Sequence, residues 1–266
     1  MKKLISSILV ASTLAVSALG ISVAASENGT NYGKVPATDE KITVDAKKDA
    51  IYDKGLEIKI DKAENGASTG TTGTAKLLWN GKDTWYVYAE IKDKEVILYE
   101  GTPNAWETDS LEVFIDYSNK VARTRDQYRV DVKGQATYYD TKTYTNDECK
   151  AFGLENWAAT TIDGGYAVEF QIKAYKEAVS ADMKVGFHFQ INDMDKANKR
   201  SLYHSDTCFN APDKFGYVVL SADKVSLPKT PAKSDTAAAT ADIGVIVSTI
   251  SLAVTSGALV VLKKRK

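Results

Sequence analysis

The stretch WETDSLEVFID, residues 106–116, has the alternation of a β-strand that buries one of its two faces. From Leu111 onward, apolar side chains at every second position share one face, and Glu112 lies on the other. A tryptophan followed by acidic residues comes just before this strand. Most tryptophans are largely buried, so Trp106 has two interpretations. It is either a core residue, or an indole at the entrance of a strand with a carboxylate beside it on the sheet.

The segments around this stretch are also rich in Val, Ile, Tyr, Phe and Trp, and turn residues separate many of them. The predicted strands are 76–79, 84–91, 111–117, 127–132, 166–172, 185–191 and 217–220. The predicted turns include Asn80-Gly81, Lys133-Gly134 and Asp163-Gly164-Gly165. A short helix is expected only at 174–180. Strands that follow one another without amphipathic helices between them predict an all-β fold, a single-domain antiparallel β-sandwich.

The same alternation sorts the polar side chains of two other predicted strands. In QYRVDV, residues 127–132, Arg129 lies on the polar face, and in FHFQIND, residues 187–193, His188, Gln190 and Asn192 share a face. If the strands 111–117 and 127–132 are neighbours, Glu112 and Arg129 meet on one face of the sheet. A structural ion pair or a solvated face would have the same pattern, so this pair alone does not define a site.

Both ends of the chain have the composition of export and anchoring segments. Two lysines, an apolar run and the small residues Val23-Ala24-Ala25 predict a signal peptide, 1–25, cleaved after Ala25. Residues 243–262 carry no charge and are long enough to cross a bilayer as a helix, and the basic tail 263–266 follows them. A buried core helix is the alternative for 243–262. The sequence therefore predicts an extracellular protein that the C-terminal transmembrane helix anchors to the cell surface.

This C-terminal layout resembles the wall-sorting tails of Gram-positive surface proteins. Leu227-Pro228-Lys229-Thr230 resembles the start of a sortase signal, although Pro231 stands where such signals have glycine. Both sortase cleavage and a retained membrane anchor therefore stay open.

Composition divides the rest of the chain into a domain and its connections. Residues 26–38 are predicted to be a linker and 222–242 a flexible stalk, since small and polar residues cannot form a core. Residues 39–221 have the size of one domain. The formal net charge is −1 and no basic stripe is present, which argues against nucleic acid as a partner.

Two cysteines, Cys149 and Cys208, lie in the exported part of the chain. In an oxidising compartment they form either a disulfide or two free thiols. A bridge would close a loop of about 60 residues and stabilise the fold by roughly 4 kcal/mol.

A series of motifs follows one another in a recognisable order: AKLLW (75–79), WYVY (85–88), WETDSLEVFID, QYRVDV, GGYAVEF (164–170), VGFHFQIND (185–193) and APDKFGY (211–217). Their order and spacing resemble those of family 9 carbohydrate-binding modules, from about residue 42 to residue 220. The resemblance implies a calcium-containing β-sandwich without catalytic activity of its own. It also implies that the partners are the ends of polysaccharide or oligosaccharide chains, and that secreted glycoside hydrolases act alongside it.

The resemblance further assigns the candidate site residues. In such modules a terminal sugar lies between two aromatic rings, and these match Trp106 and Phe209, the latter where the family usually has tryptophan. Glu112 and Arg129 match the residues that read the sugar hydroxyls, and Asp206 replaces an asparagine. Rings suit the apolar faces of a pyranose and charged groups its polar rim. The substitutions at 206 and 209 imply a weaker or altered sugar preference, and no calcium ligand is assigned.

Three other function classes stay open at this point. One is a surface adhesin or scaffold whose sandwich does not bind sugar. Another is an electron-transfer domain that holds haem through His188, His204 or Met194. The third is a glycosidase that uses a pair of the many carboxylates. A zinc enzyme is disfavoured, because the chain has only two histidines and two separated cysteines.

Overall fold

A computed structural model of the chain describes residues 29–97, 106–117, 125–138, 146–175, 177–206 and 215–228. The elements in this part of the chain are β1 (Asn31–Thr38), η1 (Ala50–Lys54), β2 (Leu56–Ile60), β3 (Lys62–Ala63), β4 (Thr72–Trp79), β5 (Thr84–Lys92), β6 (Ser110–Asp116), β7 (Arg125–Asp131), β8 (Ala136–Tyr138), α1 (Asn146–Lys150), β9 (Leu154–Ile162), β10 (Gly165–Lys173), β11 (Lys184–Met194), β12 (Arg200–His204) and β13 (Gly216–Val225). Strands dominate, as predicted, and the residues up to Leu227 form one compact unit.

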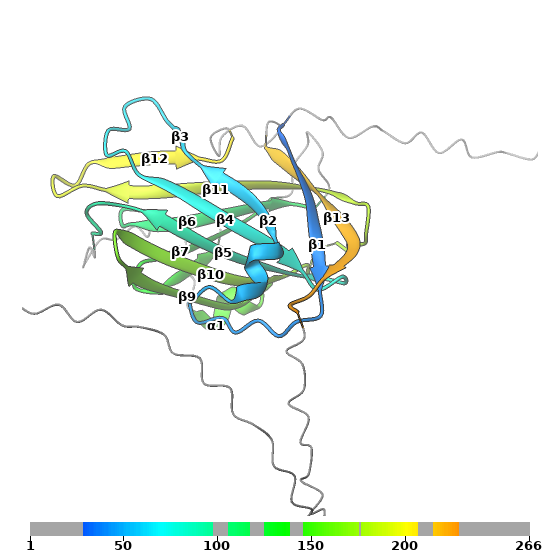
Figure 1. Cartoon of the computed structure of the whole chain (residues 1–266). Coiled ribbons are helices and arrows are strands. Elements are labelled where there is room, and N and C mark those ends of the chain that lie inside the picture. Colours follow the sequence, from blue (N-terminus) through cyan, green and yellow to red (C-terminus); the bar gives the residue numbers. More distant parts are fainter. Residues whose placement is uncertain are drawn as a thin grey trace, which may run out of the picture. The chain divides into compact units, whose positions relative to one another are not determined.

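Hydrogen bonds join the strands in the order β8-β7-β6-β11-β13-β1-β4-β5-β10-β9. This path turns back at β1, so that two layers of strands face each other across the core (Figure 1). Most neighbours are antiparallel, whereas β1 runs parallel to both β13 and β4. The short strands β12, β3 and β2 extend the layers beside β11 and β4. The all-β, single-domain prediction is confirmed.

Each of the predicted strands lies within or overlaps an observed one. The prediction that 26–38 is a linker is wrong for β1, which buries Val35 and Ala37 between the two layers. Its few apolar residues hide this strand from a composition argument, and Pro36 falls where the pairing with β13 shifts register. The domain also ends later than predicted, because β13 continues to Val225.

The prediction of a helix at 174–180 is also wrong, because the described positions of that segment contain no helical turn. The N–H of Ala174 instead donates to the carbonyl oxygen of Asp83 at 2.7 Å, which ties the segment to the β4–β5 turn. A helix of this length has little stability without an apolar face to bury. The predicted turns are confirmed, since Gly81, Gly134 and Gly164 have φ values of 76°, 79° and 75°.

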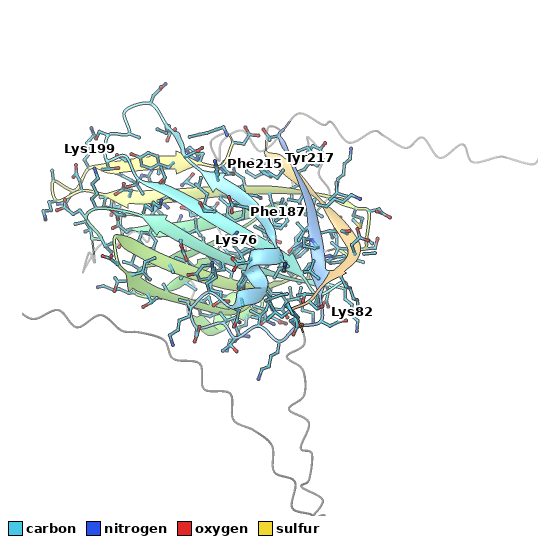
Figure 2. The ribbon with its side chains drawn as sticks, viewed as in Figure 1. Lys76, Lys82, Phe187, Lys199, Phe215 and Tyr217 are labelled. Carbon is cyan, nitrogen blue, oxygen red and sulfur yellow. The ribbon has the colours of Figure 1, made fainter. Side chains whose placement is uncertain are left out.

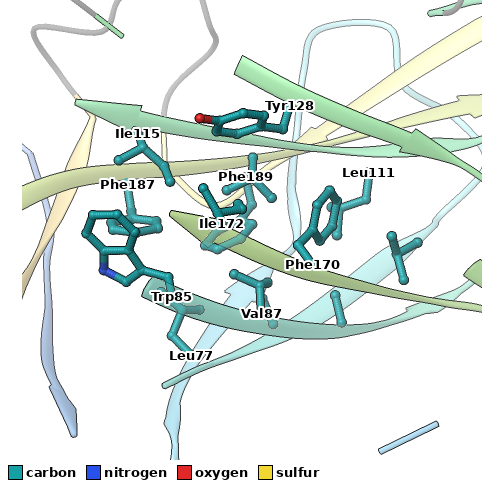
Figure 3. Packing of buried hydrophobic residues seen from close by; sticks show 14 of the residues in the cluster. Leu77, Trp85, Val87, Leu111, Ile115, Tyr128, Phe170, Ile172, Phe187 and Phe189 are labelled. Carbon is teal, nitrogen blue, oxygen red and sulfur yellow. The ribbon is translucent and has the colours of Figure 1, made fainter. Parts of the chain in front are cut away.

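The core lies between the two layers and is filled by alternate residues of the long strands (Figure 3). Leu111, with its alternate neighbours along β6, is fully buried, as the pattern of the opening stretch predicts. Trp85 packs against Tyr117 and Phe187, with ring centroids 5.4 and 5.9 Å away. Because the apolar side chains of β6 point into the core, the alternate side chains of the same strand, including Glu112, point away from it.

The predicted signal peptide, the stalk beyond residue 228 and the predicted span 243–262 all lie outside the described residues. Within the described part of the chain, no helix is both long and apolar enough to cross a membrane. Cys149 is buried and its thiol is free in this structure, while Cys208 lies outside the described residues. Of the two alternatives, the structure has a free thiol at Cys149, and burial raises the pKa of that thiol to about 11.

The segment 39–55 crosses the outer face of the layer that contains β4, β5 and β10, and η1 lies on that face (Figure 1). Its anchor is the fully buried carboxylate of Glu169 on β10. The backbone N–H groups of Asp45 and Ala46 donate to it at 3.0 Å each, and the hydroxyl of Tyr52 donates at 2.9 Å. The Tyr52 ring packs against Tyr88, with centroids 5.4 Å apart. A single carboxylate thus fastens the N-terminal segment to the sheet.

This anchor makes stability depend on pH. Burial raises the pKa of Glu169 from 4.5 to about 7, although its hydrogen bonds lower it. A pKa raised by folding means that the group's contribution is fully present below the unfolded pKa and is lost as pH rises through the folded value. The shift corresponds to about 3 kcal/mol. As the pH rises from about 5 to about 8, the unfolding free energy of the wild type should fall by about 2–3 kcal/mol more than that of Glu169→Gln.

Urea denaturation at the two pH values measures this difference. Glu57→Gln, which changes an exposed carboxylate in the same layer, is the matched control and should follow the wild type. Parallel pH profiles for wild type and Glu169→Gln would contradict the prediction.

Candidate functional site

A polar face covers the outer side of the layer formed by β6, β7 and β11. The register pairs Glu112 of β6 with Arg129 of β7 on one side and with Gln190 of β11 on the other. Side chains of directly paired residues lie on the same face of a sheet, so these three are brought together. The predicted meeting of Glu112 and Arg129 on one face is confirmed.

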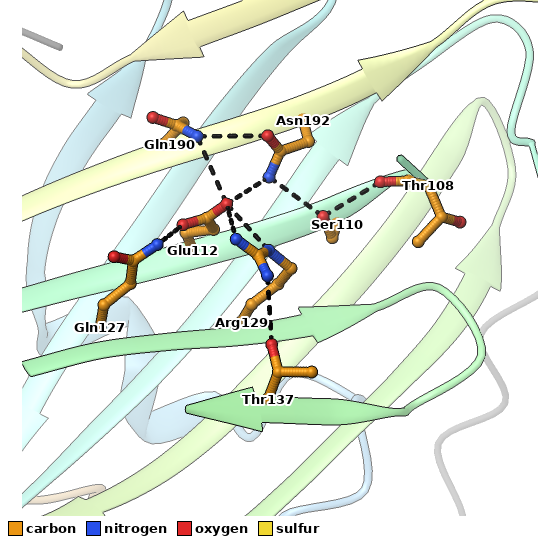
Figure 4. Close-up of polar contacts among 8 residues, drawn as sticks. All are labelled: Thr108, Ser110, Glu112, Gln127, Arg129, Thr137, Gln190 and Asn192. Atoms are coloured by element: carbon orange, nitrogen blue, oxygen red, sulfur yellow. Dashed lines mark hydrogen bonds and ion pairs between the residues drawn. The ribbon is translucent and has the colours of Figure 1, made fainter. Parts of the chain in front are cut away.

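The carboxylate of Glu112 is the centre of a hydrogen-bond network (Figure 4). Oε1 accepts from Nε and Nη2 of Arg129 at 2.8 and 2.6 Å, from Nδ2 of Asn192 at 2.7 Å and from Nε2 of Gln190 at 3.4 Å. Oε2 accepts from Nε2 of Gln127. Only 1% of Glu112 is exposed. Both carboxylate oxygens are therefore occupied by protein donors.

The network extends in both directions across the face. Asn192 donates to Oγ of Ser110 at 3.1 Å, which donates to the carbonyl oxygen of Thr108 at 3.1 Å. Nη1 of Arg129 donates to Oγ1 of Thr137 on β8 at 3.2 Å. Among the buried polar atoms of the network, Oε1 of Gln190 has no hydrogen-bond partner. The guanidinium of Arg129, held in a fixed orientation, is the group that this face offers to a hydroxylated ligand.

The tryptophan of the opening stretch lies at the edge of this face. Trp106 is 36% exposed and so is not a core residue, whereas Trp79 and Trp85 are fully buried. The guanidinium carbon of Arg129 lies 6.0 Å from the centre of the Trp106 indole. This distance allows a weak cation–π contact, and it places an exposed aromatic surface beside the polar network. The face therefore combines a flat apolar wall with hydrogen-bonding groups.

The two histidines of the chain form the buried end of the same face. His188 lies between His204 and Phe215, with ring centroids 5.3 and 4.8 Å away and both pairs stacked. Nε2 of His188 lies 3.2 Å from Nδ1 of His204, within hydrogen-bond distance. Burial lowers the pKa of His204, although Glu64 raises it. One nitrogen of each ring is used in this contact, so the geometry does not favour the haem alternative, in which the rings would bind iron.

Three buried carboxylates form a second cluster, where β5 ends and β6 begins. Oxygen atoms of Asp93, Asp109 and Asp193 all lie within 4.8 Å of one another. The two oxygens of Asp109 accept the N–H groups of Met194 at 2.7 Å and Ile97 at 2.5 Å. Oδ2 of Asp93 is buried and has no hydrogen-bond partner. The pKa of Asp109 is raised to about 8, first by burial and then by the charges of Asp93 and Asp193.

This cluster fits a calcium ion. Calcium binds oxygen ligands at about 2.3–2.6 Å, so two ligands of one ion lie no more than about 5 Å apart. The three carboxylates satisfy that limit, and the unpartnered oxygen of Asp93 supplies a ligand atom that no hydrogen bond occupies. A cation at this point would offset the repulsion of three buried carboxylates.

The model of the carbohydrate family 9 binding domain-like family matches residues 44–223. The chain belongs to this family. The match includes all of the strands from β4 to β12, so that both the polar face and the aspartate cluster are parts of a family 9 module.

Similar proteins include two bacterial xylanases. The chain is 30% identical to endo-1,4-beta-xylanase A of Thermotoga neapolitana over 205 residues, which are 74% of this chain and 18% of the enzyme. It is 32% identical to endo-1,4-beta-xylanase C of Paenibacillus barcinonensis over 155 residues, which are 57% of this chain and 13% of the enzyme. The family 9 module thus spans less than a fifth of these relatives, and their hydrolytic activity does not follow from the match.

Two solved structures of a family 9 module from Caldicellulosiruptor kristjanssonii have the same fold. One, in complex with cellotriose, has a TM-score of 0.59 and 22% identity, and the alignment covers 74% of this chain and 100% of that one. The other, in complex with glucose, has a TM-score of 0.56 and 20% identity, and the alignment covers 73% and 98% of the two chains.

The structure brings some of the predicted site residues together and not others. Trp106, Glu112 and Arg129 come together. Asp206, in contrast, accepts the backbone N–H of Thr30 at 2.9 Å, and none of its hydrogen bonds reaches the Glu112 network. Phe209 lies outside the described residues. Two members of the network, Gln190 and Asn192, were not among the predicted site residues, although the alternation of FHFQIND already put them on the polar face.

Proposed function

We propose that the polar face binds the end of a polysaccharide or oligosaccharide chain, without catalysis. The observation that carries the proposal is the exposed ring of Trp106 beside the fixed guanidinium of Arg129. The indole would cover one apolar face of a pyranose, while the guanidinium of Arg129 would donate to its hydroxyls. The complexes of the Caldicellulosiruptor kristjanssonii module with glucose and cellotriose support this ligand class.

Within this proposal Glu112 has a different role from the one first assigned to it. Its oxygens are filled by Arg129, Asn192 and the two glutamines, so it is a positioning residue that fixes the groups that touch the sugar. Glycosidase chemistry would need a carboxyl group free to donate a proton or attack a sugar, and Glu112 does not provide one.

We include calcium in the proposal, with Asp93, Asp109 and Asp193 as its ligands. When bound, the ion would supply positive charge to a buried acidic cluster and hold its three segments together. Asp109 lies three residues after Trp106 and also accepts the N–H of Met194, so the cluster is directly connected to the rim of the polar face. Calcium would therefore stabilise both the fold and the position of the indole.

Trp106→Ala tests the sugar site. Removing one aromatic wall should weaken cellotriose binding by roughly 2 kcal/mol, about 30-fold, as truncation of a binding hot spot does. Because the ring is partly exposed, the melting temperature should change little, whereas truncation of a core tryptophan costs about 3–5 kcal/mol. Calorimetry with cellotriose and thermal melts of the same protein measure the two effects.

Trp85→Ala is the matched control, since it removes a buried indole and should destabilise the fold. Cellotriitol, whose terminal sugar is opened to an alditol, tests whether the chain end is recognised, and its binding should be lost. Unchanged cellotriose affinity in Trp106→Ala would remove the indole from the site.

A further inference from the structure

The polar face continues along β11 and β12 beyond the Glu112 network. The register pairs Gln190 with His204, Asn192 with Leu202 and Met194 with Arg200. Alternate residues share a face of a strand, so Met194 and Arg200 lie on the same face as Glu112. The step from Gln190 to Met194 is about 13 Å along the strand. Arg200 is thus part of the face but lies beyond the sugar position next to Arg129.

A pocket of about 290 Å³ lies at this end of the face, lined by Trp106, Glu107, Met194, Asn198 and Arg200. The indole of Trp106 belongs both to this pocket and to the surroundings of Arg129. A ligand held against the indole can therefore extend directly into the pocket. Figure 2 shows the nearby Lys199 at the tip of the β11–β12 hairpin.

The charged groups of this hairpin differ in whether they are already engaged. Oδ1 of Asp195 accepts the N–H groups of the hairpin turn, and Lys196 pairs with Glu95. Glu107 is also engaged in an interaction of its own. By contrast, within the described ranges no hydrogen bond or ion pair engages the guanidinium of Arg200, which is exposed and always charged. Arg200 thus gives the pocket a positive charge that no other described residue pairs with.

We propose that this pocket is a subsite for an acidic sugar, and that Arg200 binds the carboxylate of a uronic acid unit next to the terminal sugar. The proposal rests on the sugar site proposed above and names its substrate class. An arginine fork matches a carboxylate with two parallel hydrogen bonds, and this pairing is stronger than hydrogen bonds between neutral groups. The thioether of Met194 and the indole supply apolar contacts for the ring that carries the carboxylate.

The test compares cellobiose, cellobiouronic acid and the methyl ester of cellobiouronic acid by calorimetry. The acid has a glucuronic acid unit attached to a terminal glucose, and the ester has nearly the same shape without the charge. We expect wild-type protein to bind the acid about fivefold to tenfold more tightly than cellobiose or the ester. Raising the salt concentration should reduce this preference, because exposed charges are screened.

Arg200→Gln should abolish the preference and leave cellobiose affinity unchanged. Lys199→Gln removes a neighbouring charge that, unlike Arg200, does not line the pocket beside Trp106, and it should keep the preference. Equal affinities for the three sugars in wild type, or a preference that survives in Arg200→Gln, would overturn the subsite while the sugar site itself stands. If wild type binds none of the three, the proposed function fails as well, and the subsite with it.

Discussion

Glu112→Ala is expected to lower the free energy of unfolding by about 3–5 kcal/mol and to abolish sugar binding. The substitution removes the acceptor of five hydrogen bonds, two of them from Arg129, whose side chain is 12% exposed. A buried guanidinium without its partner and several unpaired amide donors remain. Urea denaturation measures the stability, and calorimetry with cellotriose measures the binding.

The matched control is the ion pair between Glu57 and Lys76, in which half of the Glu57 side chain is exposed. Exposed pairs contribute about 0–1 kcal/mol, so Glu57→Ala should change stability little. The double variant Glu112→Leu, Arg129→Met should be more stable than Glu112→Ala, because it leaves no uncompensated charge. If Glu112→Ala behaved like Glu57→Ala, the network would not be a structural unit.

The alternation of WETDSLEVFID was sufficient to predict which half of β6 is buried and that Glu112 faces away from the core. It did not show that Glu112 is itself buried, because burial depends on the side chains that neighbouring strands bring to the same face. Gln190 and Asn192 come from β11, about eighty residues later in the chain, and only the sheet order places them beside Glu112. In the function proposed above, Glu112 is therefore a positioning residue, whereas the family resemblance implied a direct ligand contact.

Strands with a strong apolar pattern were predictable from the sequence, whereas a strand that is positioned mainly by its neighbours was not. β4, β5, β6, β10 and β11 carry enough apolar residues to be read from pattern alone. β1 has few, and its position between the two layers comes from pairing with β13 and β4. The acidic cluster is the extreme case, because Asp93, Asp109 and Asp193 have no motif in common and meet only in the folded chain.

Removing calcium is expected to lower the melting temperature of the wild-type protein by about 5–10 °C. A ligand present at 100 times its dissociation constant stabilises the native state by about 2.7 kcal/mol, and each kcal/mol corresponds to about 2–4 °C for a domain of this size. Differential scanning calorimetry with excess calcium and with excess chelator measures the shift. Cellotriose affinity should also fall in chelator, since Asp109 connects the cluster to the segment of Trp106 and to Met194.

Asp93→Asn separates a metal site from a cluster of carboxylates that merely repel one another. With calcium as the ligand, the variant loses a charged donor, so it should melt below wild type in calcium and show no further decrease in chelator. Without a metal, the same substitution removes one of three buried carboxylates that repel each other. It keeps Oδ1 to accept the N–H of Glu95 and replaces an oxygen that has no hydrogen-bond partner, so the variant should melt above wild type. Asp53→Asn, an exposed carboxylate outside the cluster, should respond to chelator as wild type does. The sign of the change at Asp93 therefore decides whether the cluster holds a cation.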